Sequence, residues 1–192
     1  MWLTQGHRGR GVILDSLQDK ERPQLPALLL RDRFFLMSLV LWGLNDHFFK
    51  YSYPSILTGK LSDVTSLICS PILLFIVFFR VQMAVTHLTR RGPRDLGKRY
   101  LKGLMTFCAL SMSAIMIGIN LSDTWADAYR FGLSIAQWPF VTLHSFVNYG
   151  VIPPLTTIKL TMDPSDIWTA PSSLLAILIL DRAQARLNAQ II

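Results

Sequence analysis

The sequence predicts an all-α integral membrane protein with four transmembrane helices, arranged as two tandem helical hairpins plus an outer amphipathic segment. Three observations lead to this fold class. Hydrophobic residues make up 51% of the 192 residues and charged residues only 16%, against about 25% charged residues in ordinary soluble domains. The apolar residues fall into blocks close to the roughly 20 residues that a bilayer-spanning helix requires. The basic residues border these blocks, so the net charge of +7 indicates membrane orientation rather than a nucleic-acid partner.

The positions of the apolar blocks define the predicted elements along the chain. Residues 1–31 are polar and basic and are expected to form a loosely ordered cytoplasmic arm. A membrane domain of residues 32–181 follows, with spans at about 32–53, 61–79, 104–121 and 164–180, and residues 182–192 form a cytoplasmic tail. The segment after the third span is amphipathic and rich in Trp, Tyr and Phe, which suits a helix lying at the outer membrane surface.

The first span carries polar residues near its outer end. Its purely apolar part ends at Leu44 and is too short to cross a bilayer alone, so Asn45, Asp46 and His47 are expected inside the helix. Asp46 and Lys50 stand four residues apart, a spacing at which side chains on a helix can pair. Because polar groups within a span are costly, these side chains should face other helices and find partners there.

The Lys and Arg residues predict the orientation of the chain. Six of them lie before residue 34, seven lie between residues 80 and 102, and two lie in the tail, so fifteen of the nineteen fall on one side of the predicted topology. Short loops rich in Lys and Arg stay in the cytoplasm. We therefore expect both termini and the loop between the second and third spans on the cytoplasmic side.

A short internal repeat links the two halves of the chain. Thr58-Gly-Lys-Leu-Ser-Asp63 opens the second span and Thr161-Met-Asp-Pro-Ser-Asp166 opens the fourth, so both read T-x-x-x-S-D before an apolar helix that contains a proline. The two hairpins are therefore predicted to share one orientation, as parallel repeats do in some transporters. We expect Asp63 and Asp166 at equivalent first-turn positions of two helices packed in one bundle.

The polar residues at the outer ends of the spans form one candidate cluster. Some of them end the first and third spans and the others begin the second and fourth, so a four-helix bundle would bring them together near the outer surface. The candidates are Asn45, Asp46, His47, Lys50, Lys60, Ser62, Asp63, Asn120, Asp123, Asp163, Ser165 and Asp166.

Two interpretations of this cluster stay open. As helix caps, Asp163 and Pro164 suit the N-cap and the first helical position, and a carboxylate at Asp166 would meet free backbone N–H groups. As a ligand site, the cluster would suit a cation, a proton or a polar head group, since hard cations prefer carboxylate and carbonyl oxygens. Capping explains the residues that begin helices better than it explains those that end the first and third spans.

Metal, cofactor and catalytic chemistry find little support in the sequence. His47 has no second histidine at helical spacing, although His144 in the outer segment could approach it, so no metal site and no cofactor are expected. Cys69 and Cys108 each lie inside an apolar block and are expected to be buried, reduced thiols. Common hydrolase and nucleotide-binding motifs are missing, and Glu21 is the only glutamate, so no catalytic residue set is identified.

Several of these motifs resemble a family of uncharacterised bacterial multi-pass membrane proteins. The matching residues are Leu44-Asn45-Asp46-His47, Lys50, Pro54, Leu57-Thr58-Gly59-Lys60-Leu61-Ser62-Asp63, Pro71, Asp163-Pro164-Ser165-Asp166 and Pro171. The resemblance covers roughly residues 34–180. It implies a multi-pass topology in a bacterial inner (plasma) membrane, and it implies no activity. The chain departs from the family pattern at Ser66, where the family commonly has Gly, and at Ser165, where it has Thr.

Three functions are compatible with these observations. The first is a non-enzymatic accessory or assembly protein of the membrane, favoured by the small size, the aromatic outer segment and the missing catalytic set. The second is a small transporter or ligand sensor that uses the polar cluster. The third, a lipid-modifying membrane enzyme with Asp46 and His47 as candidate bases, has the least support. The expected partners are the lipid bilayer and either another membrane protein or a second copy of the chain.

Overall fold

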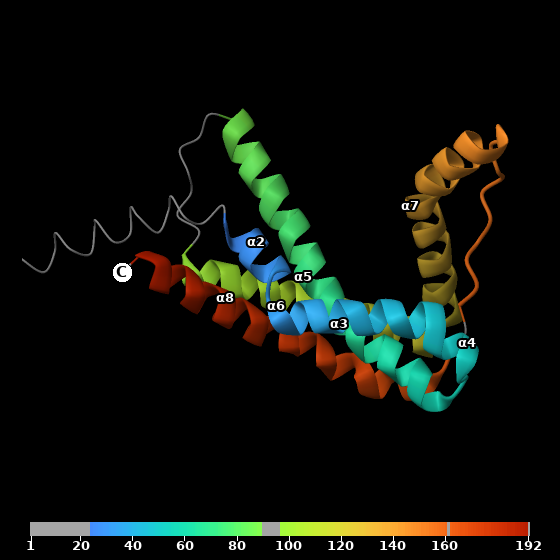
Figure 1. The fold of residues 1–192 in the computed structure, drawn as a ribbon, viewed down its shortest axis with the longest axis horizontal. Coiled ribbons are helices and arrows are strands. Elements are labelled where there is room, and N and C mark those ends of the chain that lie inside the picture. Colours follow the sequence, from blue (N-terminus) through green and yellow to red (C-terminus); the bar gives the residue numbers. More distant parts are fainter. Residues whose placement is uncertain (1–23, 90–96, 161, 192) are drawn as a thin grey trace, which may run out of the picture. The chain divides into compact units, whose positions relative to one another are not determined.

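The computed structural model describes residues 24–89, 97–160 and 162–191, and the fold in these ranges is all-helical with no β-strand, as predicted (Figure 1). The chain divides into two compact units. The first unit contains the described residues up to Ser113 and from Pro171 onward, and the second contains Ala114–Ala170. Residues 1–23 of the predicted arm and 90–96 of the predicted basic loop lie outside the described ranges.

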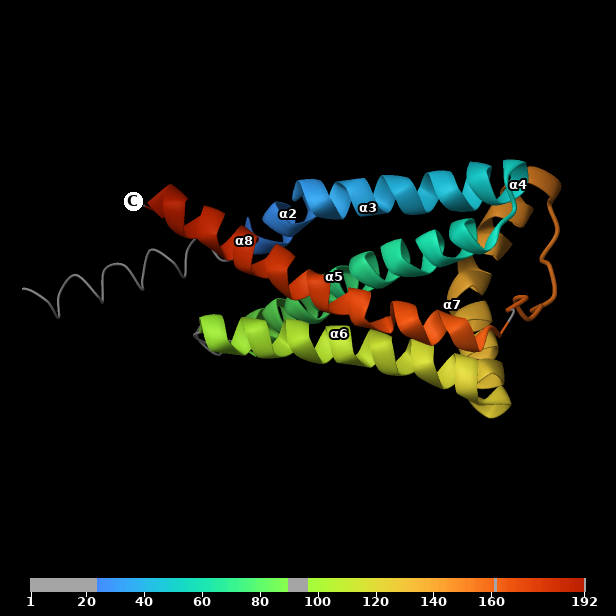
Figure 2. The same cartoon turned by 90° about the horizontal axis from the view of Figure 1, so that it is seen from below.

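The first unit is a bundle of helices that meet through apolar faces. Figures 1 and 2 both show α3, α5 and α8 running side by side, and α3 and α8 each contact α5. In chain order the elements are α2 (Leu25–Leu30), α3 (Arg33–Leu44), the π-helical turn η2 (Asn45–Phe49), α4 (Lys50–Ser52), α5 (Ile56–Leu88), the first part of α6 (Lys98–Leu121), the end of the 3-10 helix η3 (Pro164–Leu174) and α8 (Leu175–Ile191).

The core of this unit consists of stripes of apolar residues three or four positions apart, which is the spacing that places side chains on one face of a helix. The stripe of α5 includes Ile72, Phe75 and Phe79, and the stripe of α6 includes Met105 and Cys108. The core residues are Leu25, Leu29, Phe35, Cys69, Ile72, Phe75, Phe79, Leu101, Met105, Cys108, Ala176, Ile179, Leu180 and Ala183. Both cysteines are buried in this core, as predicted, while their reduced state stays a prediction.

Helix α5 begins at Ile56, five residues before the predicted start of the second span. Pro54 closes the preceding helical run because the residue before a proline avoids the helical conformation. Ser55 then caps α5: its hydroxyl accepts from the Thr58 backbone N–H at 3.2 Å, while the Thr58 hydroxyl accepts from the Ser55 N–H at 3.1 Å. This reciprocal arrangement is a capping box with threonine as the second member. The predicted first-turn position of Asp63 is therefore wrong, because Asp63 lies two turns inside α5.

Two of the four predicted spans are uninterrupted helices, long and apolar enough to cross a membrane. They lie in α5 and α6, and only 39% and 28% of their apolar stretches are buried, whereas a core helix of a soluble protein is mostly buried. The other two predicted spans are interrupted helices. The run over residues 33–52 passes through the π-helical turn η2, and the fourth predicted span starts as η3 and continues as α8.

The predicted arm and tail are helical and packed where the structure describes them. Helix α2 falls within the predicted arm, yet Leu25 and Leu29 are fully buried in the core. Helix α8 continues through the predicted tail to Ile191, with Ala183 and Leu187 buried. The prediction of a loosely ordered arm is therefore wrong for residues 25–30, whereas the cytoplasmic location of the predicted tail stays a prediction. Apolar residues one turn apart pack both segments into the first unit.

The second unit contains the end of α6, the helix α7 (Asp123–Tyr149), an irregular return segment (described over residues 151–160 and 162–163) and the start of η3. Ser122 caps α7 by accepting from the Trp125 N–H at 3.5 Å. Gly150 ends the helix with a left-handed φ of 65°, a conformation that glycine adopts at little cost, and its N–H donates to the Phe146 carbonyl at 3.0 Å. The predicted helical outer segment is therefore confirmed, while its place on a membrane surface stays a prediction.

The return segment is held against one face of α7 by three side chains spaced one turn apart. The Arg130 guanidinium donates to the Leu160 carbonyl at 2.8 Å, the Ser134 hydroxyl accepts from the Ile158 N–H at 3.0 Å, and the Trp138 indole donates to the Pro153 carbonyl at 3.2 Å. Residues i, i+4 and i+8 lie on the same face of a helix. These contacts fix an otherwise irregular chain along α7.

Candidate functional site

The predicted cluster is divided between the two units. The first unit contains Asn45, Asp46, His47, Lys50, Lys60, Ser62 and Asp63, and the second contains Asn120, Asp123, Asp163, Ser165 and Asp166.

The first group is built on the π-helical turn η2, which contains Asn45, Asp46 and His47. A π-helical turn widens the helix locally by one residue, and such turns occur frequently at functional sites. The Asn45 N–H lies between the carbonyls of Leu41 and Trp42, where the hydrogen-bonding pattern changes. The turn directs Asn45 and Asp46 toward the start of α5.

Asn45 is a buried polar side chain with one strong contact. It is fully buried, and its amide nitrogen donates to the Thr58 carbonyl at 2.6 Å. Its amide oxygen is also buried, and it has no hydrogen-bond partner among the described residues. A buried acceptor left without a partner costs about 1–3 kcal/mol, so this oxygen is the least satisfied polar atom of the group.

Asp46 connects the π-helical turn to α5. Its Oδ1 atom accepts from the Ser62 hydroxyl at 2.6 Å and lies 2.8 Å from the Lys50 ammonium group. The pairing of Asp46 with Lys50 is therefore confirmed. Both charged side chains are more than one third exposed, so the ion pair itself adds little stability. The short hydrogen bond from the buried Ser62 is the contact that fixes the position of the carboxylate.

The remaining members of the first group lie around this pair. His47 is exposed, and Lys60 and Asp63 lie half-buried on α5, on either side of Ser62 in the sequence. Within the described ranges no three His, Cys, Asp or Glu side chains converge as metal ligands. The chemistry present is a carboxylate, a hydroxyl, an ammonium group and an amide oxygen, which together can hold a proton or a small polar solute.

The second group caps helices and fixes the chain that returns to η3. Asp163 Oδ1 accepts from the Ser165 N–H at 2.9 Å and from the Ser165 hydroxyl at 2.7 Å. Asp163 therefore caps η3 with Pro164 at its first position, as predicted, and Asp166 lies in the first turn. Asn120 accepts from the Asp163 N–H at 2.9 Å and donates to the Met116 carbonyl at 3.0 Å. Both ends of its amide are thus engaged in structural bonds.

Asp123 has a different place from the one expected. It is the first residue of α7, next to the capping Ser122, and it does not belong to the end of α6. A carboxylate in the first turn interacts favourably with the positive end of the helix dipole. Asp123 is exposed and acts as a charge at the beginning of α7.

Sequence reasoning missed a second charged group in the first unit. Asp32 is fully buried and caps α3 by accepting from the Phe34 N–H at 3.0 Å. Arg182 and Arg186 of α8 approach its two oxygens at 3.6 and 3.3 Å. Nearby in the sequence of α8, Asp181 pairs with Lys102 of α6 at 2.9 Å. The partners are far apart in the sequence, and only the position of Asp32 just before the apolar run that starts at Phe34 could have indicated its capping role.

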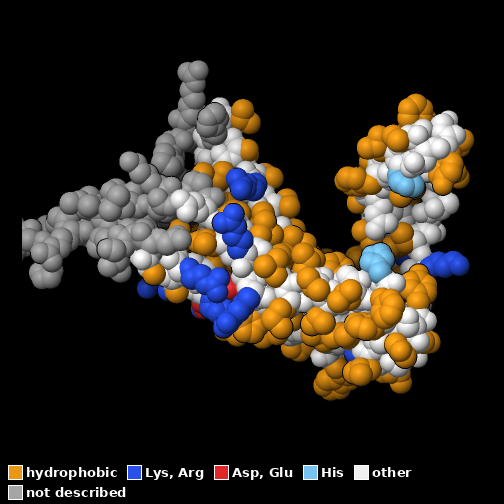
Figure 3. All heavy atoms as spheres, in the orientation of Figure 1, with side chains coloured by type: hydrophobic (Ala, Val, Ile, Leu, Met, Phe, Trp, Pro, Cys, Tyr) orange, Lys and Arg blue, Asp and Glu red, His pale blue; other side chains and the backbone are white. Residues whose placement is uncertain are grey.

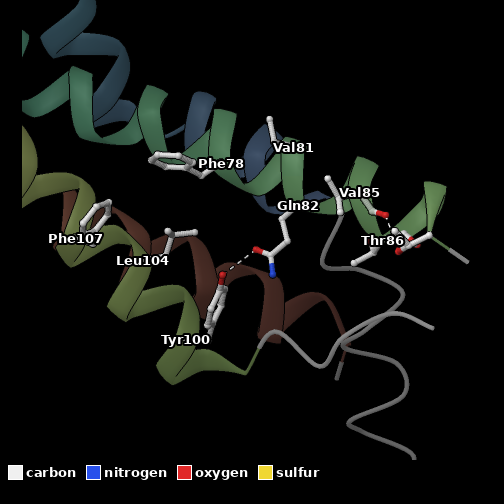
Figure 4. A pocket seen from close by; sticks show the side chains of 9 residues that line it. Phe78, Val81, Gln82, Val85, Thr86, Tyr100, Leu104 and Phe107 are labelled. Carbon is white, nitrogen blue, oxygen red and sulfur yellow. Dashed lines mark hydrogen bonds between the residues drawn. The ribbon is translucent and has the colours of Figure 1, made fainter. Parts of the chain in front are cut away.

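A cavity of about 430 Å³ lies between α5 and the start of α6. Figure 4 shows Val81 and Val85 of α5 and Leu104 of α6 along its walls, with the Tyr100 hydroxyl donating to the Gln82 amide oxygen at 2.9 Å. Apolar side chains predominate in this lining, and it contains no charged group. It offers a place for an apolar side chain or acyl chain rather than a site for catalysis.

Comparison with known proteins adds no functional information. None of the protein-family models, curated proteins or solved structures that were compared matches this chain. The functional interpretation therefore rests on the geometry of the chain's own residues.

Proposed function

We propose that this chain is a multi-pass protein of a bacterial inner membrane whose four helical segments cross the bilayer. In this arrangement α5 and α6 are continuous spans, and the interrupted helices over residues 33–52 and 164–180 complete two hairpins. Both termini and the connection between α5 and α6 lie in the cytoplasm, since fifteen of the nineteen Lys and Arg residues fall on that side.

Helix α3 and the turn that follows it support this placement because they bury polar side chains while several of their apolar side chains face outward. Ser38 of α3 and Asn45 of η2 are buried, whereas Met37, Val40 and Leu44 are exposed. Figure 3 shows hydrophobic side chains spread over the visible surface of the helices. In water such a surface would favour aggregation, but in lipid it faces a solvent of its own polarity.

The function that the structure supports best is that of a non-enzymatic accessory or assembly subunit that binds another integral membrane protein through α7. The observation that carries this proposal is that α7 exposes two apolar stripes. Phe140, Leu143 and Val147 form one stripe, opposite the face that holds the return segment, and Phe131 and Ile135 belong to the other. A helix lying on a membrane surface buries one apolar stripe in lipid, so the second remains available for a protein partner.

Site-specific photo-crosslinking in native membranes tests this proposal. A photoreactive amino acid is placed at Phe140, Val147, Phe131 or Ile135, with Met37 on α3 as the lipid-facing control. We expect one stripe of α7 to crosslink to a protein and the other stripe, like Met37, to crosslink to lipid alone. The same protein should co-purify in a gentle detergent at a fixed stoichiometry. A monomer whose two stripes both crosslink only to lipid would contradict the proposal.

A second function, a small transporter or ligand sensor, is favoured by one observation. The buried Asn45 oxygen, which has no hydrogen-bond partner among the described residues, lies on the same π-helical turn as Asp46, where a proton or a small polar solute would find a carboxylate and the Ser62 hydroxyl. Flux and ligand-binding assays on Asp46→Asn and Asp63→Asn test it. If both variants change only the abundance of the protein, and neither changes flux or binding, this second function is excluded.

A further inference from the structure

Two arginines of α8 surround one buried carboxylate at the end of the first unit where α3 begins. Arg182 and Arg186 stand four residues apart and therefore share a face of α8. Their guanidinium nitrogens lie 3.6 and 3.3 Å from the oxygens of Asp32, whose side chain is 0% exposed. Figure 3 shows several Lys and Arg side chains close together on the visible surface. Asp32 and the two arginines together carry one more positive than negative charge.

Asp32 orients the two arginines without using all of their donors. Charge-assisted hydrogen bonds between guanidinium and carboxylate groups measure about 2.7–2.9 Å, and both distances here are longer. Asp32 Oδ2 has no hydrogen-bond partner within the described ranges. Each guanidinium carries five N–H donors, and the arginine side chains are 38% and 45% exposed. Donors on both side chains therefore remain accessible to an anion from outside.

The surroundings of the pair are apolar on the side toward the membrane-spanning helices. The Arg182 guanidinium lies 3.9 Å from the centre of the Phe34 ring, a cation–π contact that holds it in place. Phe34 is itself 43% exposed, Met37 is 59% exposed one turn further along α3, and Leu178 is 56% exposed one turn before Arg182 on α8. A soluble anion needs no such apolar border, whereas a phospholipid has both a phosphate and acyl chains to place.

We propose that Arg182 and Arg186 bind the phosphate of an anionic phospholipid of the cytoplasmic leaflet, with an acyl chain against Phe34, Met37 and Leu178. Basic pockets between transmembrane helices on the cytoplasmic side bind anionic head groups. The accessible arginine donors would meet the lipid phosphate, and the apolar residues beside them would meet its acyl chains. This site is independent of α7 and of the partner proposed for it.

Lipid binding to the full chain in a neutral detergent tests the proposal. The probes are short-chain phosphatidylglycerol, phosphatidylcholine of the same chain length, and glycerol phosphate. We expect tighter binding of phosphatidylglycerol than of the other two. Arg182→Gln and Arg186→Gln should each weaken it about fivefold, which corresponds to about 1 kcal/mol per arginine. The control is Arg80→Gln and Arg99→Gln, which remove the same charge from exposed positions away from Asp32.

Asp32→Asn provides a test with the opposite sign. The asparagine oxygen can still cap α3 by accepting from Phe34, but the carboxylate that competes for the arginines is gone. We expect this variant to bind phosphatidylglycerol at least fivefold more tightly, a gain that a purely structural ion pair would not produce. Three results would overturn the proposal: an equal loss of binding in the control variants, no gain in Asp32→Asn, or glycerol phosphate binding as tightly as the lipid. If the Arg→Gln variants do not fold, Asp32→Asn alone decides.

Discussion

Replacing Asn45 by leucine should leave the first unit as stable as before or stabilise it. The substitution removes one hydrogen bond, from the amide nitrogen to the Thr58 carbonyl at 2.6 Å, and such a bond contributes about 0.6 kcal/mol inside a membrane protein. It also removes a buried amide oxygen that has no hydrogen-bond partner in the described part of the chain, and the desolvation of such an oxygen costs about 1–3 kcal/mol. The Thr58 carbonyl lies in the first turn of α5 and keeps its helical bond. The expected change is therefore a gain of roughly 0–2 kcal/mol.

The matched control is Asn120→Leu, the same substitution at a buried asparagine whose amide is fully engaged. There the side-chain oxygen accepts from the Asp163 N–H and the nitrogen donates to the Met116 carbonyl. Leucine would leave the Asp163 N–H without that acceptor, so we expect a loss of about 1–3 kcal/mol. The free energy of unfolding of both variants is measured by reversible denaturation in lipid bicelles.

A loss of more than about 2 kcal/mol in Asn45→Leu would refute this reasoning. It would mean that the Asn45 oxygen has a partner in the membrane, such as a water molecule, a cation or another subunit. If Asn45→Leu is more stable but has lost solute flux or ligand binding, the Asn45 oxygen takes part in that activity. The π-helical turn would then be less stable than it could be because its activity requires the unsatisfied oxygen.

Three further predictions concern membrane placement and helix capping. A membrane-impermeant maleimide should not label Cys69 or Cys108 in intact cells, because both thiols are buried; strong labelling would move them out of the proposed spans. A topology reporter fused near Gly92 should report the cytoplasm and one fused near Pro154 the outer side, and the reverse pattern would overturn the orientation. Asp163→Ala should destabilise the second unit by about 1 kcal/mol in thermal unfolding, and Asp163→Asn by less, since the amide oxygen still accepts from Ser165; equal losses would show that the charge itself is required.

The features that the sequence predicts well are those that depend on local patterns. Apolar blocks of membrane length locate α5 and α6, the i,i+4 spacing pairs Asp46 with Lys50, and Asp163 before a proline caps η3. The start of α5 was misplaced because its apolar block begins later than its cap. Ser55 and Thr58 form that cap, and their hydrogen bonds add the turns that precede the apolar block.

The features that the sequence does not predict depend on contacts between distant segments. Asp32 meets Arg182 and Arg186 from the opposite end of the chain, and nothing in the residues around Asp32 indicates these partners. The π-helical turn at Asn45 contacts the start of α5, and residue spacing alone does not express such a contact. For the same reason the internal repeat did not place Asp63 and Asp166 alike: the two halves share a motif but differ in the caps that precede it.

Helix α5 is longer than the hydrocarbon core of a membrane is thick. Its 33 residues extend about 50 Å at 1.5 Å per residue, whereas the hydrocarbon core is about 30 Å thick. Even at a tilt of 40°, near the upper limit for such helices, it would cover about 38 Å along the membrane normal. In the proposed topology its last turns, around Val85 and Leu88, would therefore stand among the lipid head groups or beyond them. The cavity that those turns share with Tyr100 would then open at a depth that water, lipid phosphate and soluble proteins can all reach.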